Sequence, residues 1–243
     1  MRAHLCLSVL SQSLRLGFLL ISPVALAQMY KAIYITPISN VPLTAVVKVD
    51  QTRIERDGTK INLKVVETIA RDSHGRMYRD VWKLEPASGK PQLLTICLFE
   101  PKTKTYTIID PLFKTFWTGI LDRRPEILGL GFFYDPNDNS TLASQFTHGK
   151  DLGMENVEGV PVHHVSEIEP VKDGAKKLMV TREYWYSDDL HMNLASRLDD
   201  PRAVIQTMTV TQLTRKEPDA SIYELPSGYR RVDTLFRLHS PPQ

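Results

Sequence analysis

Strict alternation of apolar and polar positions is the main pattern in this chain, and it begins after residue 43. Positions 60–70 divide into two sets, Ile61, Leu63, Val65, Glu67 and Ile69 on one face and Asn62, Lys64, Val66 and Thr68 on the other. The preceding segment, 44–55, alternates in the same way, and Asp57-Gly58 lies between the two. An Asp-Gly pair between alternating segments predicts a β-hairpin.

The same period of two recurs along most of the chain. Further strands are predicted at 76–85, 92–99, 105–109, 153–159, 160–169, 177–186, 191–198 and 203–214, with Pro170 ending the strand at 169. A short helical turn is expected at 222–225, and a strand within 228–235 that could close the sheet. This spacing predicts an all-β, mainly antiparallel fold with one or two short helices, built as a curved sheet or half-barrel. A β-sandwich is the alternative.

The middle of the chain lacks clean alternation. Residues 111–147 are rich in apolar side chains and contain Pro125, Gly129 and Gly131. We interpret this segment as an irregular apolar insertion with one or two short helical turns. It would either cap the open end of the sheet or form a lid over a ligand.

The first 27 residues have the features of a secretory signal peptide. Arg2 gives a positive start, an apolar stretch ends near Pro23, and Ala25-Leu26-Ala27 precedes Gln28 with small residues at the −3 and −1 positions. We expect cleavage between Ala27 and Gln28 and export to the periplasm or beyond. The remaining chain divides into a lead-in at 28–43, a single β domain at 44–236 and a disordered tail at 237–243.

Composition narrows the range of partners. The whole chain carries a net charge of +2, and Arg2 and Arg15 of the signal account for this excess, so the mature chain is neutral. A neutral, mixed surface argues against nucleic-acid binding. No second apolar stretch predicts a membrane span. Cys97 is the one cysteine outside the signal, which excludes an intramolecular disulfide, and its apolar strand context predicts a buried thiol.

Catalytic motifs are absent from the sequence. It contains neither the Gly-x-Ser-x-Gly elbow nor His-Glu-x-x-His nor a phosphate-binding glycine loop. His163 and His164 are adjacent on a strand and therefore point to opposite faces. Asp188, Asp189 and His191 are the one local group with metal-ligand chemistry, and a solvated turn explains them better. We therefore predict no catalytic residue, no metal and no cofactor.

Aromatic residues give the candidate binding positions. Tyr184-Trp185-Tyr186 is the densest aromatic segment, and the strand around it is partly apolar on both faces. Trp82 could play the same part on its own strand. With Phe116 and Trp117 of the insertion, these side chains are the predicted walls of an apolar site.

Several motifs resemble a family of secreted proteins of the acidobacterial type. These motifs are residues 183–190 (EYWYSDDL), 200–202 (DPR), 213–229 (LTRKEPDASIYELPSGY), 71–76 (RDSHGR), 99–101 (FEP), 110–111 (DP) and 152–160 (LGMENVEGV). They match the family patterns WYS-x-x-L, DPR and EPDxSLFxxPxGY, and together cover most of residues 44–232. The chain also resembles the half-barrel of Lol-type lipoprotein carriers and receptors. The resemblance lies in the order of the predicted strands, the apolar insertion and the PxGY ending. That resemblance implies a curved sheet around an apolar cavity that takes acyl chains.

Three functions follow from these observations. The first is a non-enzymatic exported protein that binds a lipid or a lipidated chain, with Trp82, Phe116, Trp117 and Trp185 as ligand contacts. The second is an envelope interaction module with a filled core, which binds another envelope protein through a sheet edge or face. The third, a secreted hydrolase, has only the expected compartment in its favour.

Overall fold

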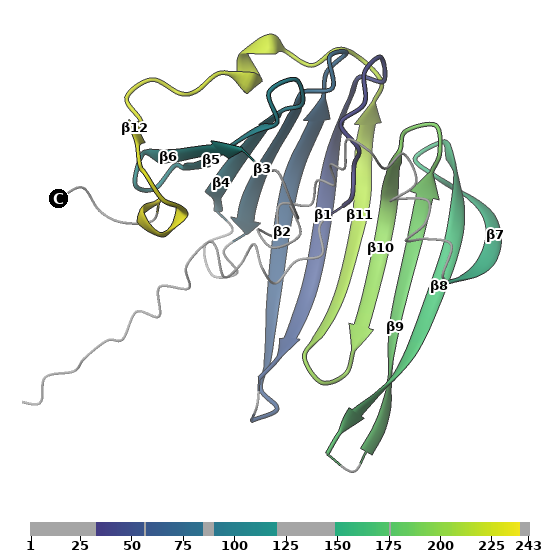
Figure 1. The fold of residues 1–243 in the computed structure, drawn as a ribbon. Helices are drawn as coiled ribbons and strands as arrows, with labels where there is room; N and C mark the ends of the chain where they lie inside the picture. The colour runs from purple at the N-terminus through teal and green to yellow at the C-terminus, as the bar shows by residue number, and fades with distance from the viewer. Residues whose placement is uncertain (1–32, 56, 85–89, 121–148, 175, 239–243) are drawn as a thin grey trace, which may run out of the picture.

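The protein forms one twelve-stranded sheet. The computed structural model describes residues 33–55, 57–84, 90–120, 149–174 and 176–238. Figure 1 shows the strands in the order β12-β6-β5-β4-β3-β2-β1-β11-β10-β9-β8-β7, so the first and last long strands, β1 and β11, meet at the centre. All neighbours are antiparallel except β12 and β6, which are parallel. The strands are β1 (Leu43–Ile54), β2 (Lys60–Arg71), β3 (Met77–Leu84), β4 (Pro91–Glu100), β5 (Thr105–Asp110), β6 (Thr115–Ile120), β7 (Lys150–Val157), β8 (Val160–Asp173), β9 (Lys176–Ser187), β10 (Met192–Asp200), β11 (Val204–Thr214) and β12 (Arg230–Arg231).

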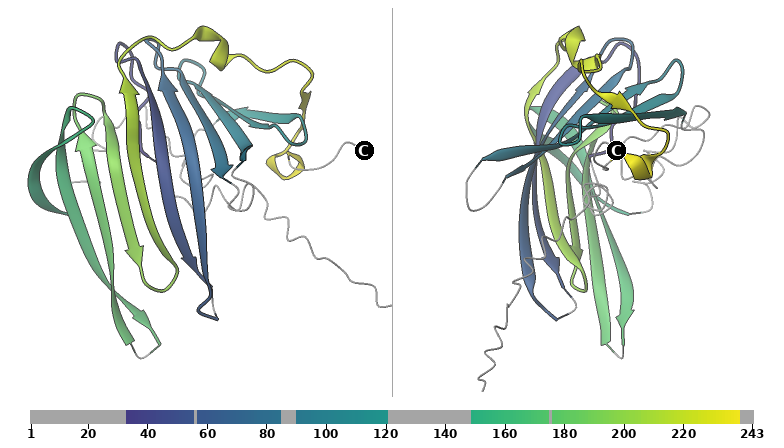
Figure 2. Two further views of the ribbon diagram at one scale, coloured as in Figure 1. Left: turned by 180° about the vertical axis from the view of Figure 1, so that it is seen from behind. Right: turned by 90° about the vertical axis from the view of Figure 1, so that its left-hand side faces the viewer.

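The predicted fold class is confirmed. The described residues form a single curved sheet with two short 3-10 helices, η2 (Ala220–Tyr223) and η3 (Leu235–Arg237). The alternative of a β-sandwich is wrong, because β1 and β11 pair and join both halves of the chain into one sheet. The side view in Figure 2 shows β5 and β6 running almost across the direction of the other strands, which gives the sheet its bend.

The hairpin of β1 and β2 follows the sequence pattern closely. The two strands pair over their full length, from Leu43 opposite Arg71 to Ile54 opposite Lys60. Gly58 has a φ of 84°, a conformation that favours glycine, and the Asp57 carboxylate accepts a hydrogen bond of 2.9 Å from the backbone N–H of Thr59. The predicted turn is therefore confirmed.

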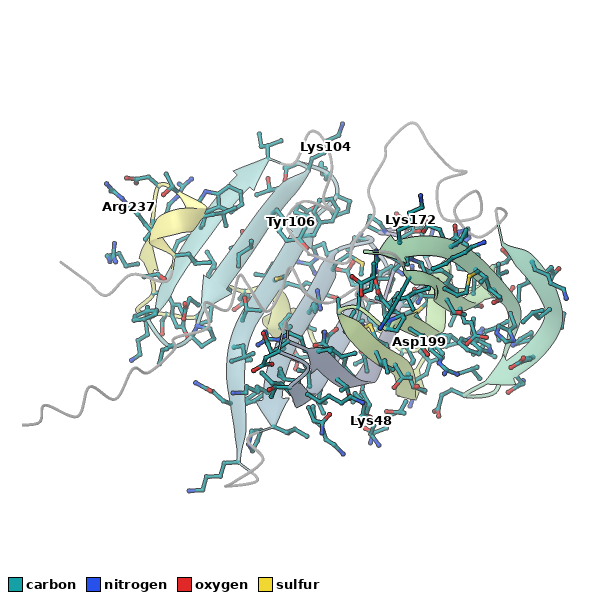
Figure 3. All side chains as sticks on the ribbon, turned by 90° about the horizontal axis from the view of Figure 1, so that it is seen from below. Lys48, Lys104, Tyr106, Lys172, Asp199 and Arg237 are labelled. Carbon is teal, nitrogen blue, oxygen red and sulfur yellow. The ribbon has the colours of Figure 1, made fainter. Side chains whose placement is uncertain are left out.

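One face of the sheet is apolar and buried in its central strands, and we call it the inner face. Alternate residues of β1 from Leu43 to Gln51 lie on it and are buried, whereas Lys48 and Asp50 between them are exposed on the outer face. In Figure 3, seen from below, Lys48 projects from the outer side of the bend and Tyr106 lies on the opposite, inner side. The sheet therefore curves around its apolar face.

The lead-in before β1 joins the sheet through a buried arginine. Ile35 forms a β-bridge with Met192 of β10. The Arg71 side chain is fully buried, and its guanidinium donates to the carbonyls of Val41 (2.8 Å), Thr36 (2.6 Å) and Leu190 (2.9 Å). Burial lowers the pKa of Arg71 to about 10. One side chain thus fastens the lead-in and the β9–β10 turn to the end of β2.

The strand around Pro170 is longer than predicted. β8 continues through Pro170 to Asp173, with Pro170 opposite Met179 of β9. The pairing of β7 with β8 stops at Ser166, so Pro170 lies where β8 has one neighbour. A proline without an N–H is tolerated at such an edge because no partner strand needs its hydrogen.

The predicted insertion and tail differ from the structure where it describes them. Residues 111–114 form a turn and Thr115–Ile120 form β6, a regular strand paired with β5, instead of irregular chain. Residues 121–148 lie outside the described residues, as does the predicted signal. The tail begins later than predicted, because Arg237 belongs to η3 and the Leu238 side chain is buried. Within 228–235 only Arg230–Arg231 form a strand, β12 at the edge of the sheet.

Removing the Arg71 guanidinium tests its part in holding the fold together. Arg71→Met takes a donor from three carbonyls, of which, among the described residues, only that of Thr36 is also bonded to another backbone N–H in the lead-in, that of Ile38, and we expect a loss of roughly 3–5 kcal/mol in the free energy of unfolding. Arg197→Met, at an arginine whose side chain is 50% exposed, is the control and should change stability by less than about 0.5 kcal/mol. Urea unfolding measures both, and equal losses in the two variants would contradict the role of Arg71.

Candidate functional site

The inner face of the central strands is the largest apolar surface that the described residues share. It combines aliphatic side chains of β1, β2, β10 and β11 with aromatic and sulfur-containing side chains of β3, β4 and β5. Its members include Leu43, Ala45, Val47, Val49, Val65, Ile69, Met77, Cys97, Phe99, Tyr106, Ile108, Leu194, Met208 and Val210. From the lead-in, Ile33 and Ile35 pack against the same cluster. Such a face is suited to apolar groups, whether they belong to the chain or to a ligand.

A buried ion pair lies within this apolar face. Arg79 of β3 donates from Nη2 to Oε1 of Glu67 at 2.6 Å and from Nε to Oε2 at 3.0 Å, a bidentate arrangement. Both side chains are almost fully buried. Burial disfavours the charged guanidinium, but the adjacent Glu67 carboxylate raises the pKa of Arg79 above its usual value. The two charges neutralise each other, so the face stays compatible with apolar groups.

Cys97 and Tyr106 lie beside this pair. Cys97 is opposite Arg79 in the β3–β4 ladder, and the ring of Tyr106 packs against Phe99 at 5.7 Å between centroids. Burial raises the pKa of the Cys97 thiol to about 11 and raises the pKa of Tyr106 well above 10. The thiol is free and buried, which confirms its predicted role as a small apolar residue.

The four predicted contact residues lie on different faces of the sheet. Trp117 of β6 is opposite Ile108, on the inner face, and its ring lies over Gly119, where a Cβ would come within 2.3 Å of it. Phe116 alternates with it and is on the other face. Trp82 and Trp185 lie in one cross-strand row that runs through Val66, Lys48, Thr209 and Ala195 on the outer side of the central strands. At its end of the sheet Trp185 is partly buried and packs against the apolar cluster, as Trp117 does.

Trp185 belongs to a polar cluster that sequence reasoning missed. Its ring stacks on His164 with centroids 4.2 Å apart. The carboxylate of Glu155 accepts from Trp185 Nε1 at 2.8 Å and lies 2.7 Å from His164 Nδ1. These two contacts, that from Trp185 first, lower the pKa of Glu155. The cluster needs β7, β8 and β9 side by side, a pairing that no local signal in the sequence gives.

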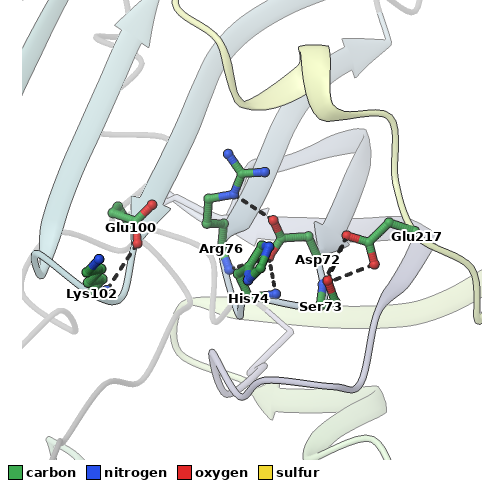
Figure 4. Close-up of polar contacts among 7 residues, drawn as sticks. All are labelled: Asp72, Ser73, His74, Arg76, Glu100, Lys102 and Glu217. Carbon is green, nitrogen blue, oxygen red and sulfur yellow. Dashed lines mark hydrogen bonds and ion pairs between the residues drawn. The ribbon is translucent and has the colours of Figure 1, made fainter.

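The turn between β2 and β3 carries a second polar group, drawn in Figure 4. Asp72 accepts from the backbone N–H of His74 and Arg76 and pairs with Arg76 Nε at 2.6 Å. Ser73 donates its backbone N–H and its hydroxyl to Glu217. The Arg76 guanidinium also lies 4.5 Å from the centre of the Tyr223 ring in η2. These contacts fasten the segment after β11 to the end of the sheet.

Within the described part of the chain, no group of three or more His, Cys, Asp or Glu side chains is arranged to hold a metal ion. No helix there has the length and apolar character needed to span a membrane.

Comparison with known proteins gives structural similarities at low identity. The chain is similar to MucB, with a TM-score of 0.37 and 15% identity over 79% of this chain and 59% of MucB, so it spans less than two thirds of that protein. It is also similar to LprF from Mycobacterium bovis (TM-score 0.33, 10% identity, 82% of this chain and 93% of that chain). A third is the LolA superfamily protein NE2245 from Nitrosomonas europaea (TM-score 0.32, 11% identity, 84% and 96%). No family model and no curated protein matches the sequence. The function is therefore inferred from the residues of this chain.

The ion pair of the inner face should behave as one unit. Glu67→Leu and Arg79→Met each leave a buried charge without its partner, and each should lower the free energy of unfolding by roughly 3–5 kcal/mol. The double variant should recover most of this loss, because two apolar side chains then replace the pair. A double-mutant cycle by urea unfolding measures the coupling. Additive losses would show that the two side chains act independently.

The burial of Cys97 predicts slow reaction with thiol reagents. With a pKa of about 11, the thiolate fraction at pH 8 is about a hundredfold smaller than at the ordinary value of 9.0. We expect labelling by a chromogenic disulfide reagent to be at least that much slower in the native chain than in urea. Equal labelling rates would show that water reaches the inner face at Cys97.

Proposed function

We propose that the protein is a non-enzymatic exported protein that binds an apolar ligand, a lipid or an acylated chain, on the inner face of its curved sheet. Export rests on the signal-peptide features of residues 1–27. Binding rests on the chemistry of the inner face. The ligand class follows from the apolar character of that face and from the neutralised charges within it.

The observation that carries this proposal is the continuous apolar face across the centre of the sheet. Measured across the strands, it extends from β5 through β1 to β10, a width of six strand spacings of about 4.8 Å each. This width exceeds the thickness of the hydrocarbon layer of one bilayer leaflet, which is about half of a ~30 Å hydrocarbon core. An acyl chain would gain about 0.8 kcal/mol for each methylene that it removes from water. The face therefore has the width and the apolar chemistry to hold such a chain, which would have to displace the part of the protein that buries the face in this structure.

Native mass spectrometry of mature protein, purified from the periplasm without detergent, tests this proposal. We expect a co-purifying adduct of lipid mass that is lost on extraction with organic solvent. The extracted protein should take up added fatty acid or phospholipid again. A clean apo mass with no uptake of either lipid would contradict the proposal.

Two tryptophans on opposite faces provide a matched pair of variants. Trp117→Ala removes a large apolar contact from the inner face and should weaken lipid binding by about tenfold. Trp82→Ala removes the same side chain from the outer face, beside Val66 and Lys48, and should leave binding within about twofold. A greater loss of binding in Trp82→Ala than in Trp117→Ala would contradict a ligand on the inner face.

A second candidate is an interaction module whose core is filled by its own side chains. It is favoured by the exposed apolar residues of the β8–β9 hairpin, Ile168 and Met179, which lie on the outer face at 61% and 47% exposure. Its partner would be another envelope protein. A clean apo mass in the experiment above, together with loss of partner capture in Ile168→Asp, would favour this candidate.

A further inference from the structure

The end of the β8–β9 hairpin stands clear of the rest of the sheet. Pairing of β8 with β7 stops at Ser166, and pairing of β9 with β10 stops at Thr181, which lies opposite Ile168. Beyond these residues the two strands pair only with each other among the described strands, up to Asp173 opposite Lys176. In Figure 1 this part of the hairpin extends past the β10–β11 turn beside it. We call the paired residues from Ile168–Thr181 to Asp173–Lys176 the hairpin tip.

Apolar side chains lie on both sides of the hairpin tip. Ile168 and Met179 lie on the outer side and are exposed, and Pro170 lies opposite Met179. Val171 and Leu178 lie opposite each other on the other side and are half-buried. Two strands alone cannot bury apolar side chains on both of their sides. The tip therefore presents apolar surface where the hairpin leaves the sheet.

Positive charge gathers at the end of the hairpin tip. Lys172 lies directly opposite Lys177, and like charges in such a pair destabilise a hairpin. Lys176 lies opposite Asp173, so three exposed lysines share one aspartate. The other carboxylate of the tip, that of Glu169, pairs with Arg182 at 3.0 Å, and no ion pair joins any of the three lysines to a carboxylate among the described residues. An anionic surface would offset the repulsion between Lys172 and Lys177.

We propose that the hairpin tip docks on an anionic lipid surface. The lysines at its end reach the lipid phosphates, while Ile168 and Met179 enter the layer between head groups and acyl chains. A lipid surface contacts both sides of a projecting hairpin at once, whereas a protein partner would need a groove that encloses it. This inference is independent of the ligand proposed for the inner face, and it names the surface on which the protein works.

Binding of the mature, full-length chain to lipid vesicles tests the proposal. Vesicles made of equal parts of phosphatidylglycerol and phosphatidylcholine are anionic, and vesicles of phosphatidylcholine alone have no net charge. We expect co-sedimentation to show binding at least about tenfold tighter to the anionic vesicles, and weaker binding as salt screens the lysines. Equal binding to both kinds of vesicle would overturn the proposal.

Two triple variants separate the hairpin tip from the net charge of the chain. Lys172→Gln, Lys176→Gln and Lys177→Gln together should weaken binding to anionic vesicles about a hundredfold, because each lysine near such a surface contributes about fivefold. The control combines Lys48→Gln, Lys102→Gln and Lys150→Gln, at three exposed lysines outside the tip, and should weaken binding by less than about threefold. Equal losses in the two triple variants would show attraction by net charge alone and overturn the role of the tip.

A fluorophore tests whether the apolar side chains of the tip enter the lipid. Met179→Cys, labelled with an environment-sensitive dye, should shift its emission to shorter wavelength when anionic vesicles are added. Leu225→Cys, at an exposed apolar residue outside the tip, should show no such shift. The native Cys97 thiol is buried and does not compete for the dye. Vesicle binding without a shift at position 179 would overturn the insertion of the tip.

The outcomes are distinguishable from those that test the proposed function. The lysine variant of the tip should still take up fatty acid, because its three lysines lie outside the apolar inner face. Loss of vesicle binding with retained fatty-acid uptake in that variant would establish the tip as a docking element. Failure of the wild type to bind anionic vesicles would overturn docking, whatever the result for the ligand of the inner face.

Discussion

A single sheet is stable in water only if one of its faces is kept dry, and this constraint governs the whole structure. The long central strands meet it by strict alternation, so that Leu43, Val47 and Val49 face inward while Lys48 and Asp50 face water. The bend of the sheet encloses the same face. Arg71 then fastens the lead-in across the end of the sheet, where Ile33 and Ile35 join the apolar cluster. The buried Glu67–Arg79 pair is tolerated on this face because its two charges satisfy each other.

The sequence was most informative about the strands and least informative about their faces. Alternation and turn residues predicted the hairpins, and the inward set of β2 was read correctly as a set that includes Glu67. Its partner Arg79 could not be predicted, because their contact depends on the register between β2 and β3. The tryptophans show the same limit. Alternation predicts that Trp185 lies on the opposite face of its strand from Tyr184 and Tyr186. Because both faces of that strand are partly apolar, alternation does not predict which of them is the inner face. Bulges after Val81 and Asn193 add further shifts that no local pattern gives.

The two faces of the sheet differ in chemistry. The apolar rows around Val47 and Ile69 would hold a hydrocarbon chain. The outer face differs in kind, since exposed charges and threonines dominate its central strands and its His164–Trp185 stack is held by Glu155. Binding on the inner face would therefore leave the outer face free to contact water or another protein.

The central claim is that an acyl chain lies on the inner face, and paramagnetic broadening of methyl resonances tests it directly. A fatty acid with a nitroxide near its end would be added to methyl-labelled mature protein. The account predicts stronger broadening of the methyl signals of Val49, Val65 and Met208 than of Val46 and Val66 on the outer face, reversed when the nitroxide is reduced. Broadening of the outer-face methyls instead, or of none, would contradict it.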